Sequence, residues 1–161
     1  MYIDLVDKKK LLKYAVDYLS KYDSSKKNLS NVLKRKIFRL NIKGYEKSKL
    51  INNLDTIVLK LEKSKLIDDK KYTNSKISSL SRAWKSKNYI SNYLIKKGIN
   101  KIEIQNNLKK FQEINNDWQL TSAKLFAKKK RLLESNLSYE KKLAKMARAG
   151  FSYDICKKII G

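Results

Sequence analysis

The sequence predicts an all-α fold on three observations. The 161-residue chain contains no Pro and four Gly, so few residues interrupt regular secondary structure. Its apolar residues recur at steps of three and four, which places them on one face of a helix. No segment sustains the alternation of apolar and polar residues that is typical of a half-buried strand.

Amphipathic helical faces follow one another along the chain. The first is built on Leu11, Ala15 and Leu19, each about one helical turn after the previous one. The same spacing recurs in later segments, and the last face contains Ile155 and Ile159. We therefore expect helices over the segments 11–19, 29–40, 50–61, 73–84, 89–94, 104–111, 118–127 and 155–160.

A segment of the middle of the chain returns 52 residues later. Each copy has a Ser that can cap the start of a helix, then a Gly that can adopt the left-handed conformation at its end. A polar residue that can cap the next helix follows the Gly. The paired positions are Ser86 with Ser138, Gly98 with Gly150, and Asn100 with Ser152.

A fainter third copy begins at Ser25 and lacks the closing Gly, with its turn expected near Asn41 to Gly44. The chain is therefore predicted to contain three tandem repeats of three short helices each, over residues 9–66, 68–114 and 117–161. Repeats of this size cannot bury a full core alone, so neighbouring repeats must stack. We expect an elongated helical array that is free to curve.

The composition excludes several kinds of catalytic and metal site. The chain has no His, which excludes a Ser-His-Asp triad, a Cys-His pair and a His-ligated metal. The one thiol, Cys156, cannot form an internal disulfide, and its apolar neighbours predict a buried side chain. The acidic pair Asp68-Asp69 is expected to cap a helix. Since there is also no Gly-rich phosphate loop, we expect no enzymatic activity and no cofactor.

Neither a secretory leader nor a membrane span is predicted. The N-terminus reaches the charged residues Asp7, Lys8, Lys9 and Lys10 within its first ten positions. No stretch approaches the ~18 consecutive apolar residues of a membrane-spanning helix. We expect a soluble cytoplasmic protein.

The charge balance predicts a polyanionic partner. The chain has 39 Lys and Arg against 15 Asp and Glu, for a net charge of +24. Three basic clusters recur at about one per repeat, so stacking can align them in a stripe that suits a phosphate backbone. We take the following residues as candidates for contact with nucleic acid or a filament: Lys34, Arg35, Lys36 and Arg39; Arg82, Lys85 and Lys87; Lys128, Lys129, Lys130 and Arg131.

Four aromatic residues lie near these clusters, namely Tyr22, Trp84, Tyr89 and Tyr93. Aromatic rings beside cations can stack on unpaired bases. Most of these residues also fit the apolar helical faces, so we expect them to belong to the core.

Three motifs give the chain a family resemblance. The first repeat closes on Leu66-Ile67-Asp68-Asp69 followed by Tyr72, and the second carries Lys97-Gly98-Ile99. The third contains Arg148-Ala149-Gly150-Phe151-Ser152-Tyr153. In this order, and over nearly the whole chain from about Leu11, these motifs resemble the RecX family of recombinase regulators.

The resemblance implies a non-enzymatic regulator of the RecA recombinase. Proteins of this kind bind RecA, lie along the groove of its filament on single-stranded DNA, and modulate recombinase and ATPase activity, most often by inhibition. The resemblance therefore implies a role in DNA repair, recombination and the SOS response, with the RecA filament and its single-stranded DNA as partners. We expect the chain to act as a monomer.

Two other interpretations stay open on the residues alone. The first is a basic helical module that binds nucleic acid without a recombinase, using a helix-turn-helix-like unit over 86–112. In that unit Ile104, Gln105, Asn106 and Asn107 offer a limited surface for base readout. The second, a ribosome- or RNA-associated helical protein, rests on charge alone.

Overall fold

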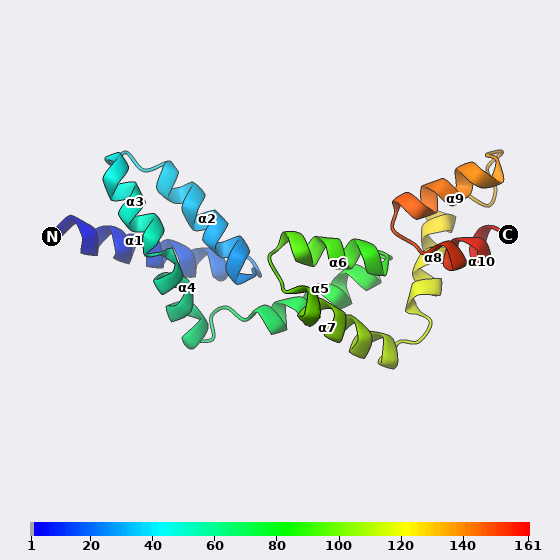
Figure 1. Cartoon of the computed structure of the whole chain (residues 1–161), viewed down its shortest axis with the longest axis horizontal. Coiled ribbons are helices and arrows are strands. Elements are labelled where there is room, and N and C mark those ends of the chain that lie inside the picture. Colours follow the sequence, from blue (N-terminus) through cyan, green and yellow to red (C-terminus); the bar gives the residue numbers. More distant parts are fainter. Residues whose placement is uncertain (1) are drawn as a thin grey trace. The chain divides into compact units, whose positions relative to one another are not determined.

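The computed structural model describes residues 2–161 and confirms the all-α fold. Within those residues every regular element is a helix, and turns or short extended connections separate the helices (Figure 1). In chain order they are α1 (Tyr2–Leu19), α2 (Lys26–Phe38), α3 (Gly44–Asn52), α4 (Leu54–Lys63), α5 (Asp69–Arg82), α6 (Lys87–Lys96), α7 (Lys101–Ile114), α8 (Trp118–Lys129), α9 (Tyr139–Arg148) and α10 (Tyr153–Ile160).

The chain divides into two compact units. Unit 1 is Met1–Tyr72 and unit 2 is Thr73–Gly161, so the division falls within the first turn of α5. The predicted repeats are a finer division. Helices α5–α7 fall within the range 68–114 and helices α8–α10 within 117–161. Stacking of three repeats stays a prediction.

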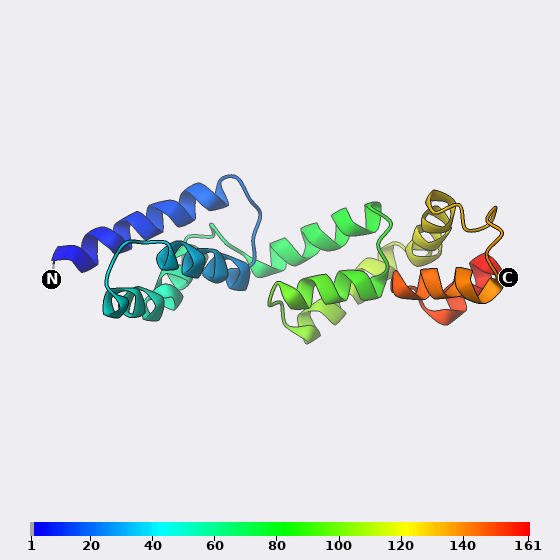
Figure 2. The same cartoon turned by 90° about the horizontal axis from the view of Figure 1, so that it is seen from above.

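Unit 1 is organised around α2, which packs against α1, α3 and α4 (Figures 1 and 2). The apolar residues of α2 recur every three or four positions, and their face is buried against the other three helices. The core of the unit consists of Leu11, Ala15, Leu29, Leu33, Ile37, Leu50, Leu54, Ile57, Leu61 and Ile67.

The first predicted repeat contains four helices rather than three. The segment expected as one helix over 50–61 is interrupted at Asn53, between α3 and α4. The Asn53 side-chain Nδ2 donates to the Lys49 carbonyl at 2.7 Å, and the Asn53 backbone N–H donates to the carbonyls of Lys49 and Leu50. An Asn side chain competes with the helical backbone for hydrogen bonds, which ends one helix and starts the next.

In unit 2, α6 packs against α7, and α10 packs against both α8 and α9 (Figure 2). Fully buried side chains of α5–α7 include Ile77, Ile90, Leu94, Ile104 and Leu108. The helices α8–α10 and their connections share a second cluster that consists of Ala123, Ala127, Leu132, Met146, Phe151 and Cys156.

The predicted helix caps are confirmed. The Ser86 Oγ accepts a hydrogen bond from the Tyr89 N–H at 3.1 Å, and equivalent side-chain caps begin four other helices. Gly98 and Gly150 have φ angles of 80° and 87°, in the left-handed conformation expected at a helix end. The other capping residues are Ser25, Asn100, Ser138 and Ser152.

Three further helices end on a left-handed residue that is not Gly. Lys65, Trp84 and Arg131 have φ angles of 56°, 57° and 49°. After Trp84, the Lys85 N–H donates to the Leu80 carbonyl at 3.0 Å, which closes the last turn as a Schellman motif. A side chain in this conformation costs about 1–2 kcal/mol, so these helix ends carry strain that Gly would avoid.

Two long-range hydrogen bonds tie the start of a helix to a later one. In unit 1 the Lys26 N–H, at the start of α2, donates to Asp69 Oδ1 at the start of α5, at 2.8 Å. In unit 2 the Lys87 N–H, at the start of α6, donates to Gln119 Oε1 at the start of α8, at 3.0 Å. Both bonds satisfy an N–H that the helix cannot pair internally. The matching arrangement is consistent with repeats of common design.

Candidate nucleic-acid interface

Lys87 begins α6, whereas five of the predicted cations lie in the last turn of a helix. Arg35 and Lys36 occupy the last turn of α2, Arg82 ends α5, and Lys128 and Lys129 end α8. The C-terminal end of a helix carries a partial negative charge, which a cation there stabilises. A structural contribution therefore accompanies any role of these cations in binding.

The first cluster belongs to unit 1. Lys34 is half-buried, whereas Arg35, Lys36 and Arg39 are exposed. The Lys36 ammonium lies 5.1 Å from the centroid of the Tyr14 ring, within the range of a cation–π contact. This cluster belongs to unit 1 and the other two clusters belong to unit 2, so a common stripe of all three stays a prediction.

The second and third clusters are brought together within unit 2. The Lys129 ammonium, on α8, lies 5.3 Å from the centroid of the Trp84 ring, which follows α5. Arg82 lies two residues before Trp84, and the half-buried Lys85 follows it directly. The Lys85 ammonium in turn lies 4.7 Å from the ring of Tyr89 on α6. Lys87, Lys128, Lys130 and Arg131 are all exposed.

The prediction that the neighbouring aromatic residues are core residues is wrong for three of the four. Tyr22, Trp84 and Tyr89 expose 57%, 36% and 42% of their surface, and Tyr93 is half-buried. For Trp84 the reason lies in the backbone. Helix α5 ends at Arg82, so Trp84 does not continue the apolar face that Ile77 shares with the rest of that helix.

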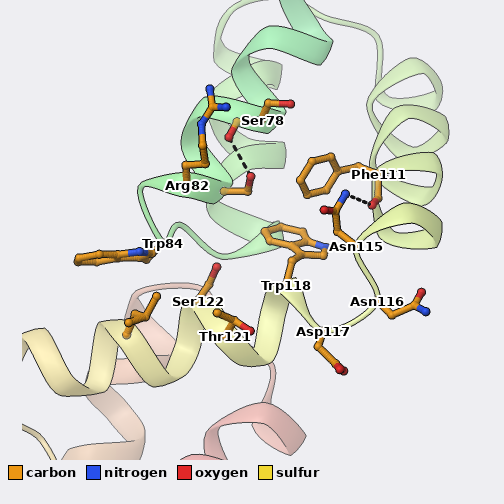
Figure 3. A pocket seen from close by; sticks show the side chains of 12 residues that line it. Ser78, Arg82, Trp84, Phe111, Asn115, Asn116, Asp117, Trp118, Thr121 and Ser122 are labelled. Atoms are coloured by element: carbon orange, nitrogen blue, oxygen red, sulfur yellow. Dashed lines mark hydrogen bonds between the residues drawn. The ribbon is translucent and has the colours of Figure 1, made fainter.

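Trp84 lines an open groove in unit 2, with a volume of about 790 Å³ (Figure 3). In the view of Figure 3, Trp84 lies on one side of the groove, and Phe111 and Trp118 lie on the other. Phe111 and Trp118 pack edge to face at 5.4 Å. The remaining lining is mostly polar and consists of Ser78, Ser81, Arg82, Asn115, Asn116, Asp117, Thr121, Ser122 and Leu125.

The polar lining was not predicted from the sequence. Ser, Thr and Asn are ordinary surface residues, so their presence does not mark a groove. The polar residues that line this groove come from three separate segments, namely α5, α8 and the connection after α7. The clearest sequence signal is Asn115-Asn116-Asp117 directly before Trp118, a polar turn that leads into a large aromatic residue. That pattern is too common to predict a groove by itself.

The acidic pair forms backbone contacts, as expected. Asp68 Oδ1 accepts from the Lys71 N–H at 3.0 Å, which caps the start of α5. Asp69 accepts from Lys26, as described above. Burial raises the pKa of Asp69 above its ordinary value of 3.8, while the hydrogen bond and the charge of Lys26 oppose that shift.

Cys156 is buried, as predicted, with 1% of its surface exposed. Burial raises the pKa of the thiol, and its Sγ donates to the Phe151 carbonyl at 3.7 Å. Such a thiol is a small apolar core group. No group of three or more potential metal-ligating side chains occurs within the part of the chain that the structure describes.

None of the helices in the described residues combines the length and apolar character needed to cross a bilayer.

No protein-family model matches the chain. A regulatory protein RecX from Myxococcus xanthus (strain DK1622) is 31% identical over an alignment of 157 residues, and the match covers 91% of this chain and 81% of that protein. The crystal structure of RecX from Lactobacillus salivarius superposes with a TM-score of 0.68 at 27% identity, over 99% of this chain and 96% of that one.

A second crystal structure, of a regulatory protein RecX, has a TM-score of 0.70 at 22% identity. The alignment covers 93% of this chain and 70% of that one, and it supports the fold. The identity to the M. xanthus protein extends over most of both chains, and the motifs at Asp68-Asp69, Gly98 and Gly150 stand in the expected order. The chain therefore belongs to the RecX family of regulatory proteins.

Proposed function

We propose that the chain is a non-enzymatic regulator that binds the RecA filament on single-stranded DNA and inhibits its recombinase and ATPase activities. The observation that carries the proposal is the 31% identity to a regulatory protein RecX over 91% of the chain. The net charge of +24 supports it, because the DNA inside a filament presents a continuous row of phosphates.

In the proposed mechanism, the chain acts in the cytoplasm as a monomer that lies along the filament groove. Exposed cations such as Arg39, Lys87 and Lys128 contact phosphates or the acidic side chains of RecA. Occupation of the groove excludes the second DNA strand. If the chain binds one filament state more tightly than another, it also shifts the filament toward that state.

The test is a titration of the protein into RecA from the same organism, with single-stranded DNA and ATP, while ATP hydrolysis and strand exchange are recorded. We expect both rates to fall with increasing protein and to reach a plateau. Unchanged rates at a concentration that saturates binding would overturn the proposal.

A pair of charge-matched variants sharpens this test. The first variant replaces Lys128, Lys129, Lys130 and Arg131 by Gln. The second replaces four exposed lysines of unit 2 outside the clusters, namely Lys96, Lys101, Lys109 and Lys110, by Gln. Both lose the same net charge, so weaker inhibition by the first variant than by the second assigns the effect to the cluster at the end of α8. Equal inhibition by both variants would show that the cluster at the end of α8 is not part of the interface.

The alternative of a helix-turn-helix module loses part of its basis. Ile104 is fully buried and cannot face a duplex, which leaves the exposed Gln105 and Asn106 on α7. Two exposed amides offer little base-specific readout. Sequence-selective binding to duplex DNA at physiological salt, with no RecA present, would favour this alternative.

A further inference from the structure

We propose that the groove beside Trp84 binds an unpaired base of single-stranded DNA, with the base stacked on the Trp84 indole. The choice of DNA as ligand rests on the proposed function. The position of the site rests on four features of unit 2: the conformation of Trp84, its exposure, the cations around it and the polar lining of the groove.

The conformation of Trp84 is the first feature. Its φ of 57° places it at a helix-ending position where Gly is the usual residue, so a large side chain there is strained. Strained residues that persist in a fold occur preferentially at functional sites. The strained conformation directs the indole out of the end of α5. If the helix continued through position 84, the indole would instead lie on the apolar face of that helix.

The second and third features are exposure and charge. Trp84 exposes 36% of its surface, although burial of a Trp side chain would be strongly favourable. The Lys129 ammonium lies 5.3 Å from the ring centroid, and Lys85 is the next residue in the chain. The Lys129 ammonium lies over one face of the ring, so a base would stack on the other face, with lysines close by for its phosphate.

The same combination continues along α6. The Lys85 ammonium lies 4.7 Å from the Tyr89 ring, and the Lys97 ammonium lies 5.7 Å from the Tyr93 ring. Tyr89 and Tyr93 are four residues apart, so they share one face of α6. Three aromatic rings, each with a lysine beside it, thus extend from the end of α5 along α6. Proteins that bind single strands use this combination of rings and cations.

The fourth feature is hydrogen-bonding capacity elsewhere in the groove that Trp84 lines. Hydroxyl and amide groups of Ser78, Ser81, Asn115 and Thr121 line it. Two of these already pair with the backbone: Ser81 Oγ donates to the Ser78 carbonyl at 2.9 Å, and Asn115 Nδ2 donates to the Phe111 carbonyl at 3.0 Å. Their oxygen atoms can still accept hydrogen bonds from the edge of a base.

These features favour an unpaired base over other occupants. Bases within a duplex are stacked on one another, so an indole can stack on a base only if that base is free. An acidic peptide would engage the lysines but would gain nothing specific from the exposed rings.

The test compares the full chain with Trp84→Gly. Gly suits the left-handed conformation of position 84, so this variant removes the ring without the misfolding that other substitutions risk. The probes are an oligothymidine of about 16 nucleotides, which spans a typical single-strand site, and an abasic oligomer of equal length. Binding is followed by fluorescence anisotropy of end-labelled DNA, and stacking by the quenching of Trp emission.

We expect the wild-type chain to prefer oligothymidine to the abasic oligomer by at least about fivefold, which is the lower end of one stacking contact. Trp84→Gly should lose that preference while it binds the abasic oligomer as before. Oligothymidine should quench the wild-type emission but not that of the variant, whose remaining Trp118 is 8% exposed. The control Lys65→Gly relieves the same backbone strain in unit 1 and should keep the preference.

Three results would overturn the inference: no preference for oligothymidine in the wild type, an equal preference in Trp84→Gly, or equal weakening of both probes by that substitution. The inference and the proposed function fail separately. A chain that restrains RecA but shows no stacking at Trp84 refutes the inference alone. A chain that stacks bases at Trp84 but leaves RecA unaffected supports the inference and refutes the proposed function.

Discussion

The Ser86 hydroxyl donates a hydrogen bond to the Ala149 carbonyl at 2.7 Å, across 63 residues of sequence. The same oxygen accepts from the Tyr89 N–H and so caps α6. Ser86 is fully buried, and it lies against the turn at Gly150 that ends α9. One side chain therefore starts a helix and fixes a distant turn within unit 2.

Replacement of Ser86 by Ala should destabilise the protein more than replacement of the equivalent Ser138. Ser86→Ala removes a cap and a second hydrogen bond, for a loss of about 2–3 kcal/mol in the free energy of unfolding. Ser138 is exposed and caps α9 through a 3.4 Å bond, so Ser138→Ala should cost about 0.5–1 kcal/mol. Urea unfolding followed by circular dichroism measures both. Equal losses would show that the bond to Ala149 contributes no stability.

Gly150→Ala should be strongly destabilising. A Cβ at position 150 would lie 2.5 Å from the Ser86 Oγ, and the φ of 87° disfavours any side chain. The expected loss is at least about 2 kcal/mol, from left-handed strain and displacement of a buried group. The control is Gly44→Ala in α3, where a Cβ would have open space. That variant should gain about 0.4–1 kcal/mol, because Ala loses less conformational freedom than Gly on folding. A loss comparable to that of Gly150→Ala would contradict the explanation.

The stability of the protein should depend on pH through Asp69. Its pKa is raised in the folded state by burial, so just above 3.8 the folded chain retains a proton that the unfolded chain has released. The free energy of unfolding therefore falls as the pH rises from 3.8 through the raised pKa.

Asp69→Asn keeps an oxygen for the Lys26 N–H and cannot ionise, so it should remove this fall. Urea denaturation at a series of pH values tests the prediction. Asp68→Asn is the control and should retain the fall, since Asp69 is still present. An unchanged pH profile in Asp69→Asn would assign the dependence to other groups.

Binding to single-stranded DNA should weaken steeply with salt, and the cluster at the end of α8 should carry part of the dependence. Each phosphate contact contributes about 0.7 to the slope of log affinity against log salt concentration for a single strand. Replacement of Lys128, Lys129, Lys130 and Arg131 by Gln should therefore lower the slope by up to about 3. The charge-matched variant in Lys96, Lys101, Lys109 and Lys110 should change it less, and an equal change in both would mean that no localised cluster exists.

Local features were the most predictable from sequence. The capping residues Ser25, Ser86 and Ser152, and the left-handed Gly98 and Gly150, stand where the pattern placed them. A cap depends on a few neighbouring residues, so its signal lies within one short segment. The sequence did not predict the break at Asn53, because the apolar residues before and after it keep the spacing of one continuous helix.

The candidate site was only half predictable. The basic clusters were visible because their Lys and Arg residues lie close together in the sequence. The exposure of Trp84 was not, since its spacing from Ile77 and Leu80 matches a continuing helix. Helix α5 instead ends at Arg82, and a left-handed turn carries the indole outward.

The sequence by itself determined that this protein is helical, strongly basic and built on RecX-like motifs, because periodicity, charge and short motifs are properties of neighbouring residues. Only the tertiary structure placed Lys129 beside Trp84, 45 positions away in the chain, and assembled a polar groove from α5, α8 and the turn after α7. Contacts of that kind arise when whole helices pack, and packing depends on the shapes of many side chains at once.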